Sequence, residues 1–366
     1  ERTKLPKLKK QNNVCKHWKT YLLGICALLI GSCTESELLV DIPEPVKINS
    51  SRKVPISFVG SHVDHATTRH FDKLYQHFNT MGVWGWRTGL NETYTPVFTN
   101  QVVSYSADST RWEYSPIQYW REGCNYTFNA YAPHQQQTDA VVSIDPSTRM
   151  ISIRNVALHG HNLQDTPTDS TKELFTNTPD IDWMVARAGQ TAIGNSGMDV
   201  DFMMQHILSK LNIRIKVDST FLRMRFISHF TVDSIVVGSL AAKGDFMQQL
   251  SHTPILTDPN EASINEWTVS DTTLTIKSLH ACTISGLPTY LVESLVLPQY
   301  ISPYATVTLY YRFHFGNGRS EECRYRIPLT EAFTRFAPGH NYTLTFTLSP
   351  QRIIFEAGSA DWEKNI

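Results

Sequence analysis

The 366-residue sequence lacks the short signatures that mark many enzymes and nucleotide-binding proteins. It contains no G-x-S-x-G, H-E-x-x-H, P-loop or G-x-G-x-x-G pattern. The sequence therefore gives no support for the serine-hydrolase, metalloprotease or nucleotide-binding activities that these patterns mark. It has only six cysteines, and no pair has zinc-finger or redox-motif spacing. Hydrophobic residues make up 41% and charged residues 18%, a composition that excludes disordered, collagen-like and coiled-coil chains. We therefore expect a globular protein that is not an enzyme and has no cofactor or metal.

Basic residues are scarce beyond the first 32 positions. That stretch holds seven Lys and Arg and one Glu, which leaves 26 basic and 33 acidic residues in the remainder, a net charge of −7 there. Nucleic-acid binding relies on clustered Lys and Arg side chains. We expect no nucleic-acid partner.

The sequence has a single long apolar run, at residues 21–30, which is shorter than the roughly 20 residues that cross a bilayer. After a basic stretch, such a run is typical of an export signal. Gly31 and Ser32 before Cys33 resemble the cleavage box of bacterial lipoproteins, whose cysteine is lipidated. We predict a signal peptide over residues 1–32 and a leader over residues 33–53, held to the outer membrane by palmitate-type chains on Cys33. The alternative is an ordinary signal peptide with a coincidental cysteine.

Short apolar runs bounded by turn residues recur from residue 54 onward. The predicted strands are residues 54–59, 97–105, 126–131, 140–144, 150–156, 211–217, 234–240, 267–276, 292–297, 306–315, 324–329 and 342–348. Asp145-Pro146 predicts a type I turn between two of them. Helical periodicity is confined to 69–78 and 331–336. Strands at this spacing are typical of antiparallel sandwiches, and the chain length favours two domains, over residues 54–218 and 219–366.

Several local patterns follow one another along the chain. They are Tyr119-Trp120, residues 126–133, residues 182–186, residues 202–211, residues 295–299, residues 338–342 and Asp361-Trp362. Their order resembles the fimbrillin-like (Mfa-like) lipoproteins of Bacteroidales, which are type V pilus subunits, over roughly residues 33–366. The resemblance implies an all-β fold of two tandem antiparallel β-sandwich domains of transthyretin-like type.

The same resemblance implies a function. It suggests a cell-surface fimbrial subunit that assembles with other fimbrial subunits by strand complementation and mediates adhesion to a target the sequence does not identify. In the family's stalk subunits, proteolysis after a basic residue removes the leader with its first strand; here Arg52 and Lys53 are the candidate site and residues 38–42 the candidate strand. Only four residues follow Trp362, which favours a tip or accessory subunit. The expected location is the outer membrane and the fimbrium.

The alternative function is a lipid-anchored, glycan-binding protein of a nutrient-uptake system. Eight tryptophans and 15 tyrosines, including Trp84, Trp86 and Trp112, could stack on sugars. We expect the histidine groups at residues 62–70 and 159–161 to be solvated loop residues, and His206 to be a buried, hydrogen-bonded side chain. Cys282 and Cys323 could either pair or remain free thiols.

Overall fold

The computed structural model describes residues 53–58, 62–63, 78–89, 93–134, 139–162, 180–191, 198–224, 226–250, 263–278, 282–349 and 352–362. All of them belong to one compact unit that spans Ser51–Ile366. The predicted signal peptide and Cys33 lie outside the described residues. Within the described part of the chain, no helix is both long and apolar enough to span a membrane.

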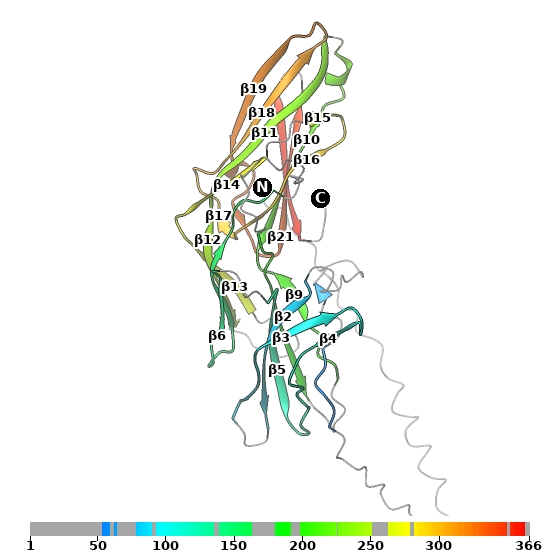
Figure 1. The fold of residues 1–366 in the computed structure, drawn as a ribbon. Helices are drawn as coiled ribbons and strands as arrows, with labels where there is room; N and C mark the ends of the chain where they lie inside the picture. The colour runs from blue at the N-terminus through cyan, green and yellow to red at the C-terminus, as the bar shows by residue number, and fades with distance from the viewer. Residues whose placement is uncertain are drawn as a thin grey trace, which may run out of the picture. The chain divides into compact units, whose positions relative to one another are not determined.

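The first sheet has seven strands and is antiparallel except at its β1–β9 edge (Figure 1). In spatial order they are β1 (His62–Val63), β9 (Met203–His206), β8 (Met184–Thr191), β5 (Asn125–Ala132), β2 (Thr80–Thr88), β3 (Thr95–Ser106) and β4 (Arg111–Glu113). Gly82 in β2 faces Tyr131 in β5, and a Cβ at Gly82 would overlap the tyrosine ring. The glycine therefore lets this aromatic side chain lie flat against the neighbouring strand.

A second sheet joins segments that are distant in sequence. Its order is β13 (Ser263–Val269), β12 (Lys243–Leu250), β7 (Ile151–Ala157) and β6 (Val141–Ile144). The β6–β7 hairpin is closed by Asp145, whose carboxylate accepts hydrogen bonds from the backbone amides of Ser147 (2.7 Å) and Thr148 (2.9 Å). The predicted hairpin is confirmed by the antiparallel pairing of β6 with β7. The Asx-type turn at Asp145 holds the chain reversal between the two strands.

Two further sheets lie in the C-terminal half. One has the order β16 (Thr289–Val296), β10 (Ser209–Val217), β21 (His340–Leu348) and β22 (Ile353–Asp361). The other has β14 (Thr273–Ser278), β11 (Ile227–Ala241), β18 (Thr306–Phe315) and β19 (Ser320–Pro328), with β15 (Cys282–Ile284) also on β11. β17 (Gln299–Tyr300) and β20 (Arg335–Phe336) form a small pair, and single 3-10 turns occupy Phe221–Arg223 (η2) and Leu329–Glu331 (η3).

Strand β10 pairs with two strands that lie far from it in the sequence. It runs parallel to β21, with Lys210 opposite Asn341 and Val217 opposite Leu348, and antiparallel to β16. The Asn212 amide donates a buried hydrogen bond of 2.7 Å to the side-chain oxygen of Asn341. β7 likewise pairs with β12, so strands on both sides of residue 218 share sheets. A division into domains at residue 218 stays a prediction.

Apolar side chains form two core clusters. The larger cluster contains Trp84, Tyr131 and Trp183 together with side chains from β7, β10, β11, β16, β18 and β21. The smaller cluster contains Phe58, Trp120, Tyr126 and Phe128. Because Trp84 and Phe128 come from the same seven-stranded sheet, both faces of that sheet are covered. The expectation that Tyr126 and Phe128 share a buried face is confirmed, with their rings stacked at 6.0 Å between centroids.

The predicted all-β class with antiparallel sheets is confirmed, while the transthyretin-like detail stays a prediction. Two local predictions are wrong. The helix expected at 331–336 is a 3-10 turn followed by β20, and the single strand expected at 267–276 is two strands, β13 and β14, that pair with different partners. The helix expected at 69–78 falls almost entirely outside the described residues.

Candidate functional site

The segment at residues 54–58 directly follows the predicted processing site. It is held by separate backbone contacts rather than by a continuous ladder: Ile56 donates to the Gln118 carbonyl (2.8 Å), and Trp120 donates to the Val54 carbonyl (2.9 Å). On the other side, Val200 donates to the Ser57 carbonyl (2.8 Å), and the Ser57 hydroxyl contacts the Asp199 carboxylate. The segment is therefore fixed on both sides.

Phe58 anchors this segment in the smaller core. The side chain is 1% exposed, and its ring lies 5.7 Å from Phe98, 5.5 Å from Tyr114 and 5.7 Å from Phe202, between centroids. Ile56 is buried beside it, and the Tyr114 hydroxyl donates to the Ile56 carbonyl at 2.6 Å. Residues 54–58 thus form part of the core rather than a loose extension of the leader.

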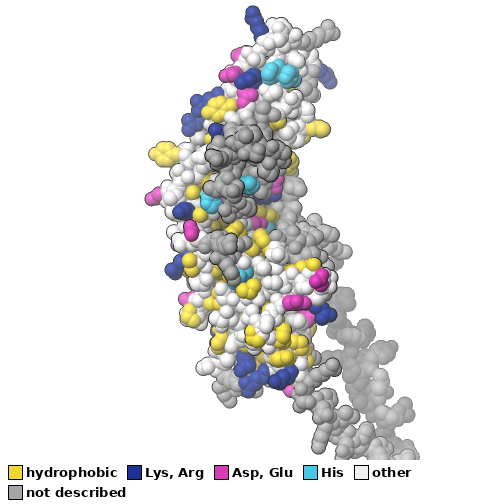
Figure 2. Space-filling view, viewed as in Figure 1, with side chains coloured by type: hydrophobic (Ala, Val, Ile, Leu, Met, Phe, Trp, Pro, Cys, Tyr) yellow, Lys and Arg dark blue, Asp and Glu magenta, His cyan; other side chains and the backbone are white. Residues whose placement is uncertain are grey.

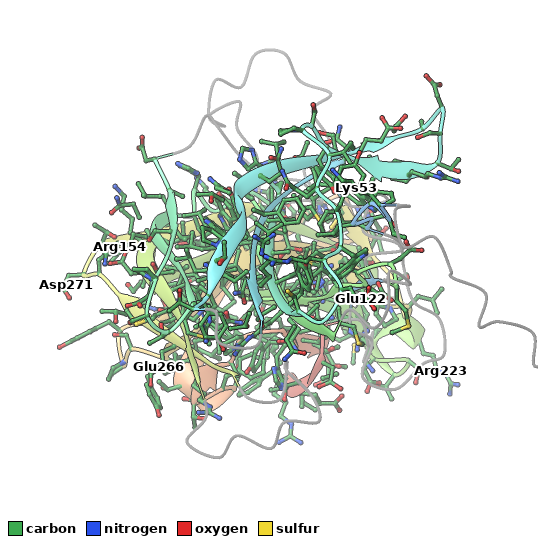
Figure 3. The ribbon with its side chains drawn as sticks, turned by 90° about the horizontal axis from the view of Figure 1, so that it is seen from below. Lys53, Glu122, Arg154, Arg223, Glu266 and Asp271 are labelled. Carbon is green, nitrogen blue, oxygen red and sulfur yellow. The ribbon has the colours of Figure 1, made fainter. Side chains whose placement is uncertain are left out.

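Lys53 is the one predicted processing residue that the structure describes. It is exposed, and its ammonium lies 5.7 Å from the centre of the Tyr119 ring, within cation–π range. Figure 3 shows its position in the view from below. Arg52 lies outside the described residues. Cleavage at this site stays a prediction.

The long strand β3 has one incompletely paired side. It pairs with β2 from Thr95 to Ser104, whereas β4 covers its other side only at Ser104–Ser106. Among the described residues, no strand ladder covers that second side between Thr95 and Val103. Backbone amides and carbonyls on such a side can pair with an added strand.

His206 lies in the core, as the sequence predicts. Its Nδ1 lies 2.9 Å from a carboxylate oxygen of Asp182, and its ring stacks on Trp362 at 4.4 Å between centroids. Trp362 also donates its backbone amide to the Gly339 carbonyl at 2.9 Å, and Gly339 has the left-handed φ of 67°. These contacts hold the end of the described chain to the end of β9 and to Gly339 just before β21, which is a structural role.

The histidine groups do not form a metal centre in the described part of the chain. His159 Nδ1 lies 3.1 Å from Asp180, whose carboxylate also accepts the backbone amides of His159 and His161. No group of three His, Cys, Asp or Glu side chains that could hold a metal ion occurs among the described residues. His65 and His70, and the side chain of His62, fall outside that description.

Cys124, Cys282 and Cys323 are free thiols, so Cys282 and Cys323 do not form a disulfide with each other. Cys282 lies opposite Val232, Val232 opposite Tyr311, and Tyr311 opposite Cys323. Three strand spacings of about 4.8 Å separate the two cysteines, far beyond the roughly 7 Å that a disulfide can span. Burial raises the pKa of both thiols.

The tryptophans considered as sugar-stacking residues pack mostly inside the protein. Trp84 and Trp112 are buried, and Trp86 is partly buried against the larger core. Large exposed apolar side chains lie elsewhere, including Tyr94, Tyr300 and Tyr304. Figure 2 shows hydrophobic side chains at the surface next to Lys and Arg on the face that it presents. Sequence counts of aromatics could not separate the buried from the exposed ones.

Comparison with protein families identifies the chain. The model of the fimbrillin-like family matches residues 68–362, which is most of the sequence. The chain belongs to the fimbrillin-like family. The family predicted from the sequence patterns is thereby confirmed, and fimbrillin-like proteins are structural and adhesive subunits. No curated protein matches this fimbrillin-like chain.

Solved structures of low sequence identity resemble this fimbrillin-like chain. A candidate cell adhesion protein from Bacteroides uniformis has 18% identity and a TM-score of 0.47, with 85% of this chain and 99% of that one covered. A second, from Bacteroides ovatus, has 15% identity and a TM-score of 0.49, with 86% and 99% covered. The tip fimbrial protein Mfa3 from Porphyromonas gingivalis, truncated at its C-terminus, has 11% identity and a TM-score of 0.36, with 85% and 100% covered.

Proposed function

We propose that this chain is a cell-surface fimbrial subunit that mediates adhesion. The observation that carries the proposal is the fimbrillin-like family match across residues 68–362. The all-β body of sheets with uncovered strand sides is consistent with a building block. The partners are other fimbrial subunits, and the location is the cell surface or the fimbrium.

Assembly proceeds by strand complementation at β3. The side of β3 that no described strand pairs with between Thr95 and Val103 is the acceptor, because it is long enough to pair with a strand of ordinary length. The anchor at Phe58 stays in place during this step, since it is buried in the smaller core. The incoming strand comes from another subunit, or from this chain's own leader before processing.

The finer parts of the proposal concern the leader and the position in the fibre. Lipid on Cys33 anchors the chain to the outer membrane, and cleavage at Arg52 or Lys53 releases the leader. The exposed position of Lys53 supports this site. We further propose a tip or accessory position, as expected from the sequence.

Immunogold labelling of isolated fimbriae, together with co-purification of fimbrial subunits, tests the main proposal. Gold at filament ends supports a tip subunit, and gold along shafts contradicts the tip position while supporting a fimbrial role. A protein found only on the cell body, without fimbrial subunits in the purified fraction, would overturn the fimbrial role.

Two variants test the finer steps. Cys33→Ala should abolish membrane partitioning, and the double variant Arg52→Ala with Lys53→Ala should leave an unprocessed chain. For the acceptor edge, Thr99→Cys should crosslink to a neighbouring subunit that carries a cysteine in its donor strand, because Thr99 is exposed in β3. Thr110→Cys, in the exposed turn after β3, is the control. Equal crosslinking at both positions would contradict the acceptor edge.

A further inference from the structure

Strand β19 forms one edge of a C-terminal sheet. It pairs with β18 along its whole length, from Ser320 to Pro328, and the register of this ladder has no shift. Among the described residues, no strand pairs with the other side of β19, which is the outermost strand of its sheet (Figure 1). A long edge without a bulge can pair with a strand of another molecule.

The hydrogen bonds at the two ends of the β18–β19 ladder show which residues face the free side. Phe315 donates its amide to the Arg319 carbonyl at 2.8 Å, and Leu329 donates its amide to the Ala305 carbonyl at 2.8 Å. Hydrogen-bonded pairs recur at every second residue of an antiparallel ladder, so the odd-numbered residues of β19 bond to β18. Pro328, which has no amide proton, fits this alternation because it faces away from β18. The backbone amides and carbonyls that point to the free side are those of Ser320, Glu322, Arg324 and Arg326.

Three of these outward-facing residues carry exposed charges of both signs. One carboxylate oxygen of Glu322 accepts a hydrogen bond of 2.7 Å from the Arg312 guanidinium in β18. The guanidinium carbon of Arg324 lies 5.6 Å from the centre of the Tyr310 ring, and Arg326 is exposed further along the strand. A carboxylate can accept hydrogen bonds from more than one guanidinium. The edge therefore presents an acid followed by two bases, and it can pair favourably with only some charge patterns.

This charge pattern is complementary to itself in one antiparallel register. Two copies of β19 can pair only if residues that face the free side meet each other. In the register centred on Cys323, each Glu322 lies opposite Arg324 of the other copy. Registers centred on Glu322 or on Arg324 put that residue opposite itself, and a register centred on Tyr325 puts Arg324 opposite Arg326. Like charges directly opposite each other are destabilising, so the register centred on Cys323 is favoured.

The same register places Cys323 opposite Cys323 of the second copy. Because odd-numbered residues bond to β18, the two cysteines form a non-hydrogen-bonded pair, in which Cα atoms lie about 4.5 Å apart, within the range that a disulfide spans. Cys323 is a half-buried free thiol in the structure. Glu321 lies opposite Tyr325 on the same face, which sets no like charges against each other. The register therefore has a chemical signature that the other registers lack.

We propose that β19 is a self-pairing edge, through which two copies of this chain associate in the antiparallel register centred on Cys323. Main-chain hydrogen bonds join the two sheets into one, and the Glu322–Arg324 pairs fix the register. The occupant is a second copy, because the charges of the edge match the same edge turned around. This contact goes beyond strand complementation at β3, which lies in a different sheet. A single pair of strands buries little surface, so the dimer is weak and depends on concentration.

Sedimentation equilibrium of the whole purified chain, in the presence of a reducing agent, tests the pairing. The chain should shift from monomer to dimer as its concentration rises. Glu322→Arg and Arg324→Glu should each weaken the dimer about tenfold, because the reversed charge acts at both symmetry-related pairs. The variant with both reversals should restore the dimer, since each acid again faces a base. Glu356→Arg is the matched control, a charge reversal at an exposed position of β22, which is an edge strand of the other C-terminal sheet.

Oxidative crosslinking tests the register. Copper phenanthroline with oxygen removes one hydrogen from each of two opposed thiols and joins the sulfur atoms as a disulfide. Electrophoresis without reductant should then show a covalent dimer, and mass spectrometry should find the Cys323 peptide joined to itself. Cys323→Ser should abolish this product. Cys282→Ser should retain it, because Cys282 lies in β15, which is separated from β19 by β11 and β18.

Four outcomes would overturn the self-pairing edge. They are a monomer at every concentration, a dimer that tolerates both single reversals, no recovery in the double variant, and the absence of a Cys323–Cys323 crosslink. Thermal melts confirm that each variant is folded. All of these measurements use the isolated chain, so the β19 contact could fail while the fimbrial role stands, and a failure of immunogold labelling would leave the β19 contact in place.

Discussion

The imidazole of His206 stacks on the indole of Trp362, with centroids 4.4 Å apart and planes 14° apart. His206 belongs to β9, in the seven-stranded sheet, and Trp362 directly follows β22, in the sheet that contains β10 and β21. The contact therefore joins two sheets through a pair of rings, and the Asp182 carboxylate lies 2.9 Å from Nδ1 of the imidazole.

Removing this indole should weaken the fold. We expect Trp362→Ala to lower the free energy of unfolding by about 2–3 kcal/mol, less than for a fully buried tryptophan, because the side chain is only partly buried. Denaturant unfolding measures the change. Trp362→Phe keeps a ring for stacking and should lose less than half as much; equal losses for both variants would contradict a stacking role.

Gly82 should not tolerate a side chain. The Cβ of Gly82→Ala would overlap the Tyr131 ring, so we expect a loss of about 3 kcal/mol or more in the free energy of unfolding. Gly238→Ala is the control, because nothing lies within 4 Å of a Cβ at Gly238 in β11. That variant should change stability by less than about 1 kcal/mol. Similar losses at the two sites would show that the Tyr131 contact is not the cause.

The anchor at Phe58 should be essential to the smaller core. Phe58→Ala removes a ring that contacts Phe98, Tyr114 and Phe202, and we expect it to cost about 3–5 kcal/mol in unfolding free energy. Phe226→Ala, at a 62% exposed position, should change stability by less than about 0.5 kcal/mol. If Phe58→Ala were as stable as Phe226→Ala, residues 54–58 would not belong to the core.

The histidine pair on β11 and β18 should make stability depend on pH. His229 and His314 stack with centroids 4.2 Å apart, and His314 shares a hydrogen bond of 3.0 Å with Thr231. Burial, followed by the charges of His229 and Arg312, lowers the pKa of His314 from its usual 6.5, while Asp233 opposes the shift. As pH falls, the unfolded chain takes up this proton first. Stability is therefore complete above about pH 6.5 and is lost as pH falls through the folded-state pKa.

His314→Gln removes this contribution, so urea midpoints at pH 7.5 and pH 5.5 should differ less in the variant than in the unaltered chain. His159→Gln is the control, since His159 lies on a different segment beside Asp180. A pH dependence that is unchanged by His314→Gln would rule out the pair as its source.

A reducing agent should leave the stability of the folded chain unchanged. Cys282 and Cys323 lie in one row of the sheet but on strands separated by β11 and β18. Unfolding midpoints with and without dithiothreitol should coincide, and mass spectrometry of the denatured, alkylated chain should show both thiols modified. A mass consistent with an internal disulfide would contradict the strand order of this sheet.

Alternation of apolar and polar residues predicted much of the strand content correctly. β18 matches its predicted range, and β5 differs from its predicted range by one residue at each end, because both strands are short apolar runs bounded by turn residues. β2 and β8 went unpredicted, since Gly82, Gly85 and the alanines of β8 weaken the apolar pattern. Gly82 and Gly85 leave room for the rings of Tyr131, Phe98 and Phe128, a reason that only the packed structure reveals.

The candidate sites were harder to predict from the sequence than the strands were. The basic residue Lys53 could be picked out by its type, but its position beside the buried Phe58 depends on contacts with Gln118 and Val200 that are remote in sequence. The strand pattern and the family patterns both predicted the all-β class correctly, and the family patterns also predicted the fimbrillin-like family.

The parallel pairing of β10 with β21 constrains the order of folding. Val217, at the end of β10, pairs with Leu348, so this sheet cannot form completely until the chain as far as residue 348 is available. For β10 and β21 to pair, the long stretch of chain between them must first be brought into a loop. The entropy cost of closing this loop makes such topologies slow to fold. Until β21 is in place, one side of β10 has unpaired backbone amides and carbonyls that could pair with a strand of another chain.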